Sequence, residues 1–300
     1  GVTRVIDGVE YSSVQPSLSW LSPGGLSASA ITAGLVVAVF AYWGWDTAVS
    51  VNEECSDSNR TPGVAAVLSV FILLAIYLLT SFGTQAFLGP QFVIDNSGDA
   101  VSAVGKEALG GFFNKFLIVA VLTSAAASCQ TTILPATRSM LSMGSHKAGP
   151  AVMAKIDHKT LTPAWSTWAF GAVSCLWFVG LAVASGGTMI TADSNVYWSS
   201  IAAVGLAIAF YYGITGYACV WYYRKHLFTS AKNLLLVGVL PLLGAVILTY
   251  VFIKTIVDAS KADYAPGTTF GVGTVLVIGT ILLILGFPLM LWCRARYSSF

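Results

Sequence analysis

Charged residues are scarce in this chain: Asp, Glu, Lys and Arg together make up 9% of its 300 residues. Soluble domains usually contain about 25% charged residues, so the composition excludes an ordinary soluble fold. Hydrophobic residues make up 56% of the chain and its mean hydropathy is +0.78, which predicts an integral membrane protein surrounded by lipid. The few basic residues are scattered among loops, so nucleic acid is not an expected partner.

Residue patterns typical of membrane enzymes and pumps are also missing. The sequence contains no HExxH, no GxSxG, no phosphate-binding glycine loop and no pair of acids within one apolar segment. All three histidines, His146, His158 and His226, fall in loops, so no histidine relay crosses the membrane. The five cysteines form no CxxC motif and are expected to be reduced fillers. The prediction is a protein that is not an enzyme and holds no metal or cofactor.

Seven apolar segments are each long enough to cross a bilayer as a helix, which takes about 20 residues. The predicted spans are about 27–53, 63–88, 113–143, 163–185, 196–223, 234–257 and 270–293. The third span either ends near Pro135 or continues past it as a kinked helix. The expected fold class is therefore all-α transmembrane.

Lysine and arginine are divided unevenly between the two sides of this predicted bundle. The side on which the seventh span ends holds Arg60, Arg138, Lys147, Lys155, Lys159, Arg224, Lys225, Lys232, Arg294 and Arg296. The other side holds Arg4, Lys106, Lys115, Lys254 and Lys261. Because cytoplasmic loops are enriched in basic residues, we expect a multi-pass protein of the cytoplasmic membrane with a cytoplasmic C-terminus and residue 1 outside.

The first span carries both an acid and a glycine in its middle, within Phe40–Asp46. An acid at bilayer depth costs about 2.5–3.5 kcal/mol, and Gly44 weakens the helix by roughly 1 kcal/mol relative to alanine. These features predict a helix that opens near Gly44 to hold something polar, as discontinuous helices do in secondary transporters. The alternative is a kinked helix in which Asp46 bonds a neighbouring helix.

Opening the helix would expose backbone groups of both polarities. The half before the break would present carbonyls, which suit an ammonium group or a cation, and the half after it would present N–H groups. Asp46 would lie in the first turn of the second half, where the helix dipole stabilises an anion by about 0.3–2 kcal/mol. Phe40, Tyr42 and Trp43 flank the break and could close over an apolar or cationic ligand.

A charged stretch follows the first span at the cytoplasmic boundary. Glu53, Glu54 and Arg60 are predicted to form ion pairs that close a cytoplasmic gate, the alternative being an ordinary charged helix end. Thr61 as cap and Pro62 at the first helical position predict the start of the second span.

The third and fifth spans are rich in small residues. The third carries a run of small and hydroxylated residues over 123–132, and the fifth places Gly205, Ala209 and Gly213 four residues apart. This spacing favours close helix packing; in the third span a ligand path or hydroxyl ligands for sodium are the alternative.

Two segments are expected to lie on the outer face. Residues 1–26 are predicted to be an external loop that is the remnant of a longer chain. The loop at 89–112 contains an apolar stretch near Val101–Val104, which is either a short helix over the outer face or part of a plain solvated loop.

The segment from the predicted break in the first span to the start of the second span resembles the sixth helix and following loop of amino acid permeases of the amino acid–polyamine–organocation (APC) superfamily. The matching residues are Phe40-Ala41-Tyr42-x-Gly44-x-Asp46, then Glu53-Glu54, then Asn59-Arg60-Thr61-Pro62. The family continues after Glu-Glu with Asn-Pro-x-Arg-x-x-Pro, from which this chain departs at Ser58 and Asn59 and by one residue fewer before the last proline. Arg138 with its basic loop, and Thr162-Pro163, resemble the loop after helix eight. The resemblance covers essentially the whole chain, as helices six to twelve.

This resemblance implies a LeuT-type fold, in which residues 27–223 form the second inverted repeat and residues 224–300 contain two peripheral helices. It also implies a partner, the missing N-terminal half that carries the first repeat. The backbone carbonyls near the break would hold the substrate amino group, Phe40 would be a gating aromatic, and Asp46 would couple transport to protons. The implied substrate-binding set is Phe40, Ala41, Tyr42, Trp43, Gly44, Ser124 and Ala127.

One leading function and two alternatives follow. The leading function is secondary transport of amino acids by alternating access, as a symport with protons or, alternatively, with sodium. A polyamine or organic cation permease would use the same carbonyls, acid and aromatic residues. A non-transporting receptor or scaffold is the third class, because seven spans with an outside N-terminus superficially match a receptor.

Overall fold

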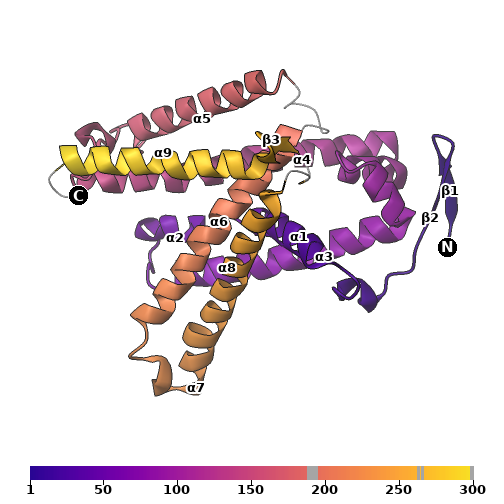
Figure 1. The fold of residues 1–300 in the computed structure, drawn as a ribbon, viewed down its shortest axis with the longest axis horizontal. Coiled ribbons are helices and arrows are strands. Elements are labelled where there is room, and N and C mark those ends of the chain that lie inside the picture. The colour runs from indigo at the N-terminus through magenta and orange to yellow at the C-terminus, as the bar shows by residue number, and fades with distance from the viewer. Residues whose placement is uncertain (188–194, 262–263, 265–266, 298–300) are drawn as a thin grey trace. The chain divides into compact units, whose positions relative to one another are not determined.

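A computed structural model describes residues 1–187, 195–261, 264 and 267–297 of the chain (Figure 1). The chain divides into two compact units, one made of Gly1–Ser22, Gly44–Gly180 and Cys293–Phe300, the other of Pro23–Trp43 and Leu181–Trp292. The predicted boundaries at residues 26 and 223 concern an internal repeat, and this division of contacts does not test them.

Six helices in the described parts of the chain are long and apolar enough to cross a membrane. They are Thr61–Asp95, Ala100–Ser145, Ala164–Val183, Val196–Tyr222, Ala231–Ala259 and Thr274–Arg296, and a shorter apolar helix covers Ala28–Ala41. Each overlaps one of the seven predicted spans, and only the first falls short of a full crossing because it is interrupted. The all-α transmembrane fold is confirmed, and the chain is a multi-pass membrane protein.

The first unit begins with a β-hairpin where the sequence predicted only a loop. Strands β1 (Thr3–Ile6) and β2 (Val9–Ser12) pair antiparallel, with Ile6 opposite Val9. Asp7 and Gly8 between them both have positive φ, the geometry that a two-residue hairpin turn requires. Asp-Gly was therefore a local signal that the loop prediction missed.

Tyr11 is one of the side chains that join the hairpin to the first long helix. Tyr11 of β2 packs edge-on against Phe92, with ring centroids 4.9 Å apart, in a buried cluster with Leu88 and Val104. Its hydroxyl donates a hydrogen bond of 2.9 Å to Asp95, and this bond raises the pKa of Tyr11. A 3-10 turn, η1 (Leu18–Leu21), follows the hairpin.

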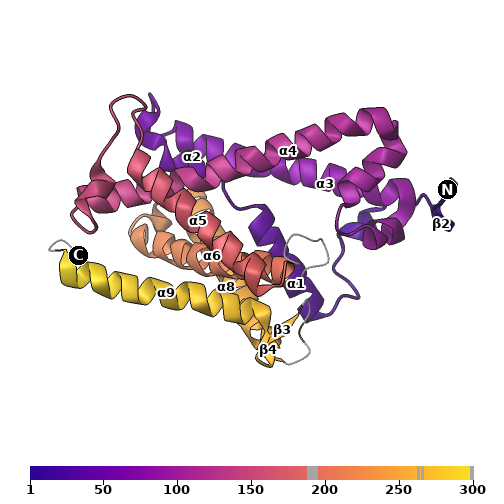
Figure 2. The ribbon, with the colours of Figure 1, turned by 90° about the horizontal axis from the view of Figure 1, so that it is seen from above.

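Two long helices, α3 (Thr61–Asp95) and α4 (Ala100–Ser145), run alongside one another in this unit (Figure 2). Gly89 and Gly110 have non-helical φ,ψ angles of 82°,161° and 77°,164°, so each helix bends sharply there. The segment 89–112 is therefore mostly helical: the short helix over Val101–Val104 is confirmed and the plain loop is wrong.

Several boundaries in this unit are set locally. Helix α4 continues past Pro135, and α3 has Arg60 rather than Thr61 as its N-cap, so the predicted cap was placed one residue late.

Thr160 donates two hydrogen bonds to Asp157 in the loop after α4 and thereby lowers the pKa of Asp157. The remaining elements are α2 (Thr47–Ser50), η2 (Asn52–Glu54), η3 (Ala151–Ala154) and α5 (Ala164–Ala184).

The second unit is built around α6 (Asn195–Tyr222), which contacts both α1 (Ala28–Ala41) and α8 (Leu240–Ala259). Figure 1 shows α6 and α8 side by side. The other elements of this part of the chain are η5 (Leu227–Thr229), α7 (Ala231–Asn233), a π-helical turn η6 (Leu234–Val239), β3 (Thr268–Thr269), β4 (Val272–Gly273) and α9 (Thr274–Arg296).

Small residues let α6 approach both of its neighbours. A Cβ atom on Gly205 would lie 2.5 Å from the backbone carbonyl oxygen of Val36 in α1. On the other side, a Cβ atom on Gly216 would lie 3.0 Å from the carbonyl oxygen of Pro241 and 2.9 Å from the Cβ of Ala245. The close packing predicted for the fifth span is therefore confirmed.

Replacing Gly205 with alanine is expected to destabilise the protein by about 1–3 kcal/mol, because backbone cannot move aside as a flexible side chain would. The melting temperature of the purified full-length protein in detergent measures this. Gly244→Ala in α8 is the matched control, since a Cβ atom there meets nothing within 4 Å. Equal melting temperatures for the two variants would contradict the packing described here.

Candidate functional site

The first apolar helix is interrupted where the sequence predicted it. Helix α1 ends at Ala41, α2 begins at Thr47, and the residues between them form turns. Gly44 has φ = +110°, a backbone conformation that residues with a Cβ atom rarely adopt. A Cβ atom at Gly44 would meet nothing within 4 Å, so the glycine is needed for its conformation and not for space.

The end of α1 tightens before the break. The N–H of Tyr42 donates to the carbonyl of Ala38 at 2.9 Å, and the N–H of Trp43 donates to the carbonyl of Phe40 at 3.1 Å. The second bond spans three residues instead of four, as in a 3-10 turn. The carbonyl end of α1, the negative end of its dipole, therefore lies at the break, as predicted.

Asp46 occupies the N-cap position of α2. Its carbonyl accepts hydrogen bonds from the N–H groups of Val49 and Ser50, at 3.0 and 3.1 Å, while its side chain makes no capping bond to the helix. The side chain is half-buried. The predicted position at the start of the second half-helix is observed, whereas a role in proton coupling stays a prediction.

Within the first unit, the segment after the break lies against the run of small residues in α4. The hydroxyl of Thr47 donates to the carbonyl of Thr131 at 3.0 Å. Ser124 lies seven residues before Thr131 in the same helix, which is about 10 Å along its axis, and both Ser124 and Ala127 are exposed. Their assignment to the substrate-binding set stays a prediction.

Within the second unit, the end of α1 is tied to α6 through an aromatic pair. The indole Nε1 of Trp43 donates to the hydroxyl of Tyr211 at 2.7 Å. The sequence singled out Trp43 but not Tyr211, although the aromatic run Phe210–Tyr212 among small residues was a signal for it. This bond orients one of the three aromatic side chains that flank the break; the other two, Phe40 and Tyr42, are half-buried.

Glu54 of the predicted cytoplasmic gate pairs with a basic residue other than Arg60, and the gating role itself stays a prediction. Arg138 of α4 donates to the carboxylate of Glu54 and forms an ion pair with it. Glu53 and Arg60 are exposed, and among the described residues no ion pair joins them. The sequence marked Arg138 as a basic residue of that side and as part of the family resemblance, but not as a partner of Glu54, because an ion pair between residues so far apart in the chain leaves no local signal.

Exchanging the charges of this pair tests whether it matters for the working protein. Arg138→Glu places two acids together and is expected to lower solute uptake roughly fivefold, the equivalent of about 1 kcal/mol for a partly exposed pair. The double variant Glu54→Arg with Arg138→Glu restores the attraction and is expected to recover most of the loss. Arg60→Glu is the matched control, and a double variant no better than the single one would refute the pairing.

Comparison with known proteins yields a family and one named relative. A family model described as "Amino acid permease" matches residues 10–287. The vacuolar cationic amino acid transporter 4 of Arabidopsis thaliana is 24% identical over 188 residues, which cover 63% of this chain. The match spans only 31% of that relative's length. No solved structure matches the chain.

Proposed function

Because this chain belongs to the amino acid permeases of the APC superfamily, we propose that it is part of a secondary transporter that binds an amino acid at the break between α1 and α2. The observation that carries this proposal is the interrupted helix itself. It places a carbonyl end, a positive-φ glycine and an acid within seven residues of an apolar segment. The carbonyls near Phe40, Ala41 and Trp43 would accept hydrogen bonds from the substrate ammonium group.

The connections on the two sides of the break support transport by alternating access. The boundary between the two compact units falls between Trp43 and Gly44. Helix α1 contacts α6 and α8, whereas α2 contacts α3 and α4. The two halves of the broken helix thus have different packing partners, and the short connection with Gly44 in it is suited to absorb a change in backbone angles between them.

The substrate class has two candidates within transport. The named relative is a cationic amino acid transporter, and a carbonyl end together with Asp46 and aromatic side chains suits a cationic side chain as well as an amino group. We propose amino acids as the class, with polyamines or organic cations as the second candidate. Putrescine competing against labelled arginine as strongly as unlabelled arginine does would favour the second.

The charge distribution and the fold family support a membrane topology and a missing partner for this chain. The excess of lysine and arginine on one side supports a cytoplasmic C-terminus and a place in the cytoplasmic membrane. The proposed fold is LeuT-type, with this chain as its second repeat, so an N-terminal half would complete the substrate pocket.

Solute flux is the direct test of the function. The full-length protein in proteoliposomes is expected to accumulate labelled arginine or alanine against a gradient when an inward proton gradient is imposed. Replacing sodium with choline at constant pH separates the two possible coupling ions. Binding of the amino acid without any accumulation would refute transport and favour the receptor class.

A further inference from the structure

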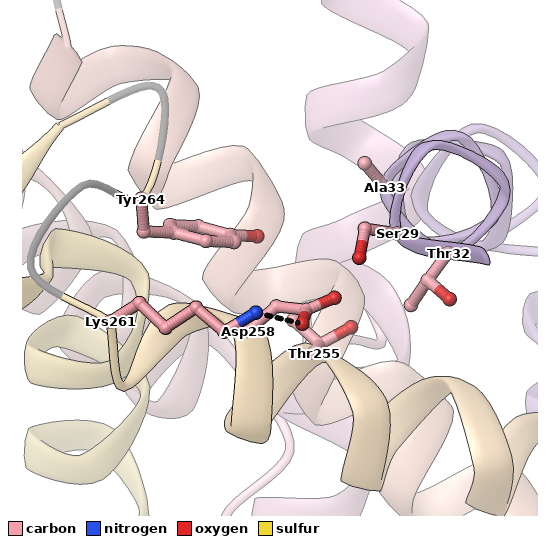
Figure 3. Close-up of a pocket in the computed structure, with 7 residues that line it drawn as sticks. All are labelled: Ser29, Thr32, Ala33, Thr255, Asp258, Lys261 and Tyr264. Atoms are coloured by element: carbon pink, nitrogen blue, oxygen red, sulfur yellow. Dashed lines mark hydrogen bonds and ion pairs between the residues drawn. The ribbon is translucent and has the colours of Figure 1, made fainter. Parts of the chain in front are cut away.

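A polar cavity lies at the other end of α1 from the break, within the second unit. Its volume is about 190 Å³. Figure 3 shows that side chains from two helices and the segment after α8 converge on it: Ser29 and Thr32 of α1, Thr255 and Asp258 of α8, then Lys261 and Tyr264. Ser29 lies 12 residues before Ala41, so the cavity is about 18 Å along the helix from the break.

The charged groups of this cavity leave one excess positive charge. The ammonium group of Lys254 lies 2.5 Å from both carboxylate oxygens of Asp258 and 3.0 Å from the hydroxyl of Ser29. The ammonium group of Lys261 lies 3.2 Å from the same carboxylate. Lys254 therefore neutralises Asp258, while Lys261, whose side chain is 59% exposed, carries the remaining charge at the rim.

One hydroxyl group in the cavity has no hydrogen-bond partner. Thr255 is only 2% exposed, and its Oγ1 finds neither donor nor acceptor among the described residues. Buried hydroxyl groups are nearly always hydrogen-bonded, so this one is available to donate to a ligand in the cavity. The neighbouring hydroxyl of Thr32 already donates to the carbonyl of Ala28 at 2.8 Å and has only lone pairs left to offer.

Tyr264 adds a second donor. Burial, and secondly the charge of Asp258, raise the pKa of Tyr264, so its phenol keeps its proton at neutral pH. The cavity thus offers three donors for a carboxylate, on Thr255, Lys261 and Tyr264, and an acceptor for an ammonium group on Thr32, while the oxygens of Asp258 are already bonded to the two lysines. A simple amine would be repelled by the excess charge of Lys261, whereas the carboxylate of an amino acid would neutralise that charge.

We propose that this cavity is a second, peripheral binding site for the zwitterionic backbone of an α-amino acid. The carboxylate would lie between Lys261, Thr255 and Tyr264, and the ammonium group would face the hydroxyl oxygen of Thr32. The inference rests on the proposed function, because it assumes that amino acids are the solute. If residue 1 lies outside, the site is at the outer end of α1, where an arriving solute would bind before it reaches the break.

Equilibrium binding to the full-length protein tests the proposal. The probe is labelled arginine or alanine, whichever the flux experiment shows to be transported. Wild-type protein is expected to bind two molecules, one at the break and one in the cavity. Thr255→Val and Lys261→Gln are each expected to weaken one of the two sites at least tenfold, through the loss of one hydrogen bond to a charged group, and to leave the other unchanged.

Folding is controlled for by conservative variants. Thr255→Val keeps the shape and removes an unpartnered hydroxyl, so its melting temperature is expected to equal or exceed that of the wild type. Thr255→Ser and Lys261→Arg keep the donors and should retain both sites. Lys225→Gln, outside the cavity, is the matched control for a lost positive charge.

The failure of this proposal is distinct from the failure of the function. A wild-type protein that transports the amino acid but binds only one molecule of it overturns the peripheral site alone. The peripheral site is also overturned if acetate or chloride displaces the labelled probe as effectively as the unlabelled amino acid does. A protein that neither transports nor binds any amino acid overturns both proposals.

Discussion

Gly44→Ala is expected to reduce amino acid uptake by the full-length protein roughly 10- to 100-fold while the protein still reaches the membrane. The backbone at Gly44 has φ = +110°, and a residue with a Cβ atom held in such a region is strained by about 1–3 kcal/mol. Since each 1.4 kcal/mol is a factor of ten in an equilibrium, the variant would shift the connection between α1 and α2 away from its present geometry. Uptake of labelled amino acid at fixed surface expression measures the effect.

Gly34→Ala is the matched control for this experiment. Gly34 lies in the middle of α1, has ordinary helical geometry and has room for a Cβ atom. The same substitution there adds a better helix former and should leave uptake at or near the wild-type level. If the two variants transported equally well, the break at Gly44 would not be the working part of the site.

Asp46→Asn is expected to abolish the dependence of uptake on external pH and to stop proton entry with the solute. An ionised acid at bilayer depth costs about 2.5–3.5 kcal/mol, and α2 is too short to return much of this through its dipole. Proton coupling needs a group that can take up and release a proton, and Asp46 is the acid of the interrupted helix. Asparagine resembles the protonated form and cannot release a proton.

The measurement pairs labelled uptake between pH 5 and 8 with a pH-sensitive dye inside proteoliposomes. Wild-type uptake is expected to rise as the outside becomes more acidic, because the inward proton gradient then drives the solute. Asp57→Asn, an exposed acid of the following loop, is the control. If Asp46→Asn left the pH profile of uptake unchanged, Asp46 would have a purely structural role.

The sequence predicted most of the fold and the position of the candidate site. Apolar length alone located every long helix, and a costly acid beside a glycine located the interruption near Gly44. The small-residue spacing around Gly205 predicted the close approach of α6 to a neighbour. Each of these depends on a property of a short segment, which is why it could be read before any contact was known.

Two kinds of structural feature were not predicted from the sequence. The turn at Asp7-Gly8 and the N-cap at Arg60 are local, and a closer look at hairpin signals would have found the first. The partners of the site are not local: Thr131 beside Thr47, Tyr211 beside Trp43 and Arg138 beside Glu54 each come from a helix far along the chain.

The amino-acid sequence by itself determined that this chain crosses the membrane several times and that one crossing is interrupted. Hydrophobic length and the backbone freedom of glycine are properties of the segment that carries them. Only the tertiary structure decided which side chains meet, as when Lys254 joins Ser29 to Asp258 across 225 residues. Such contacts depend on the packing of whole helices, and no short segment contains that information.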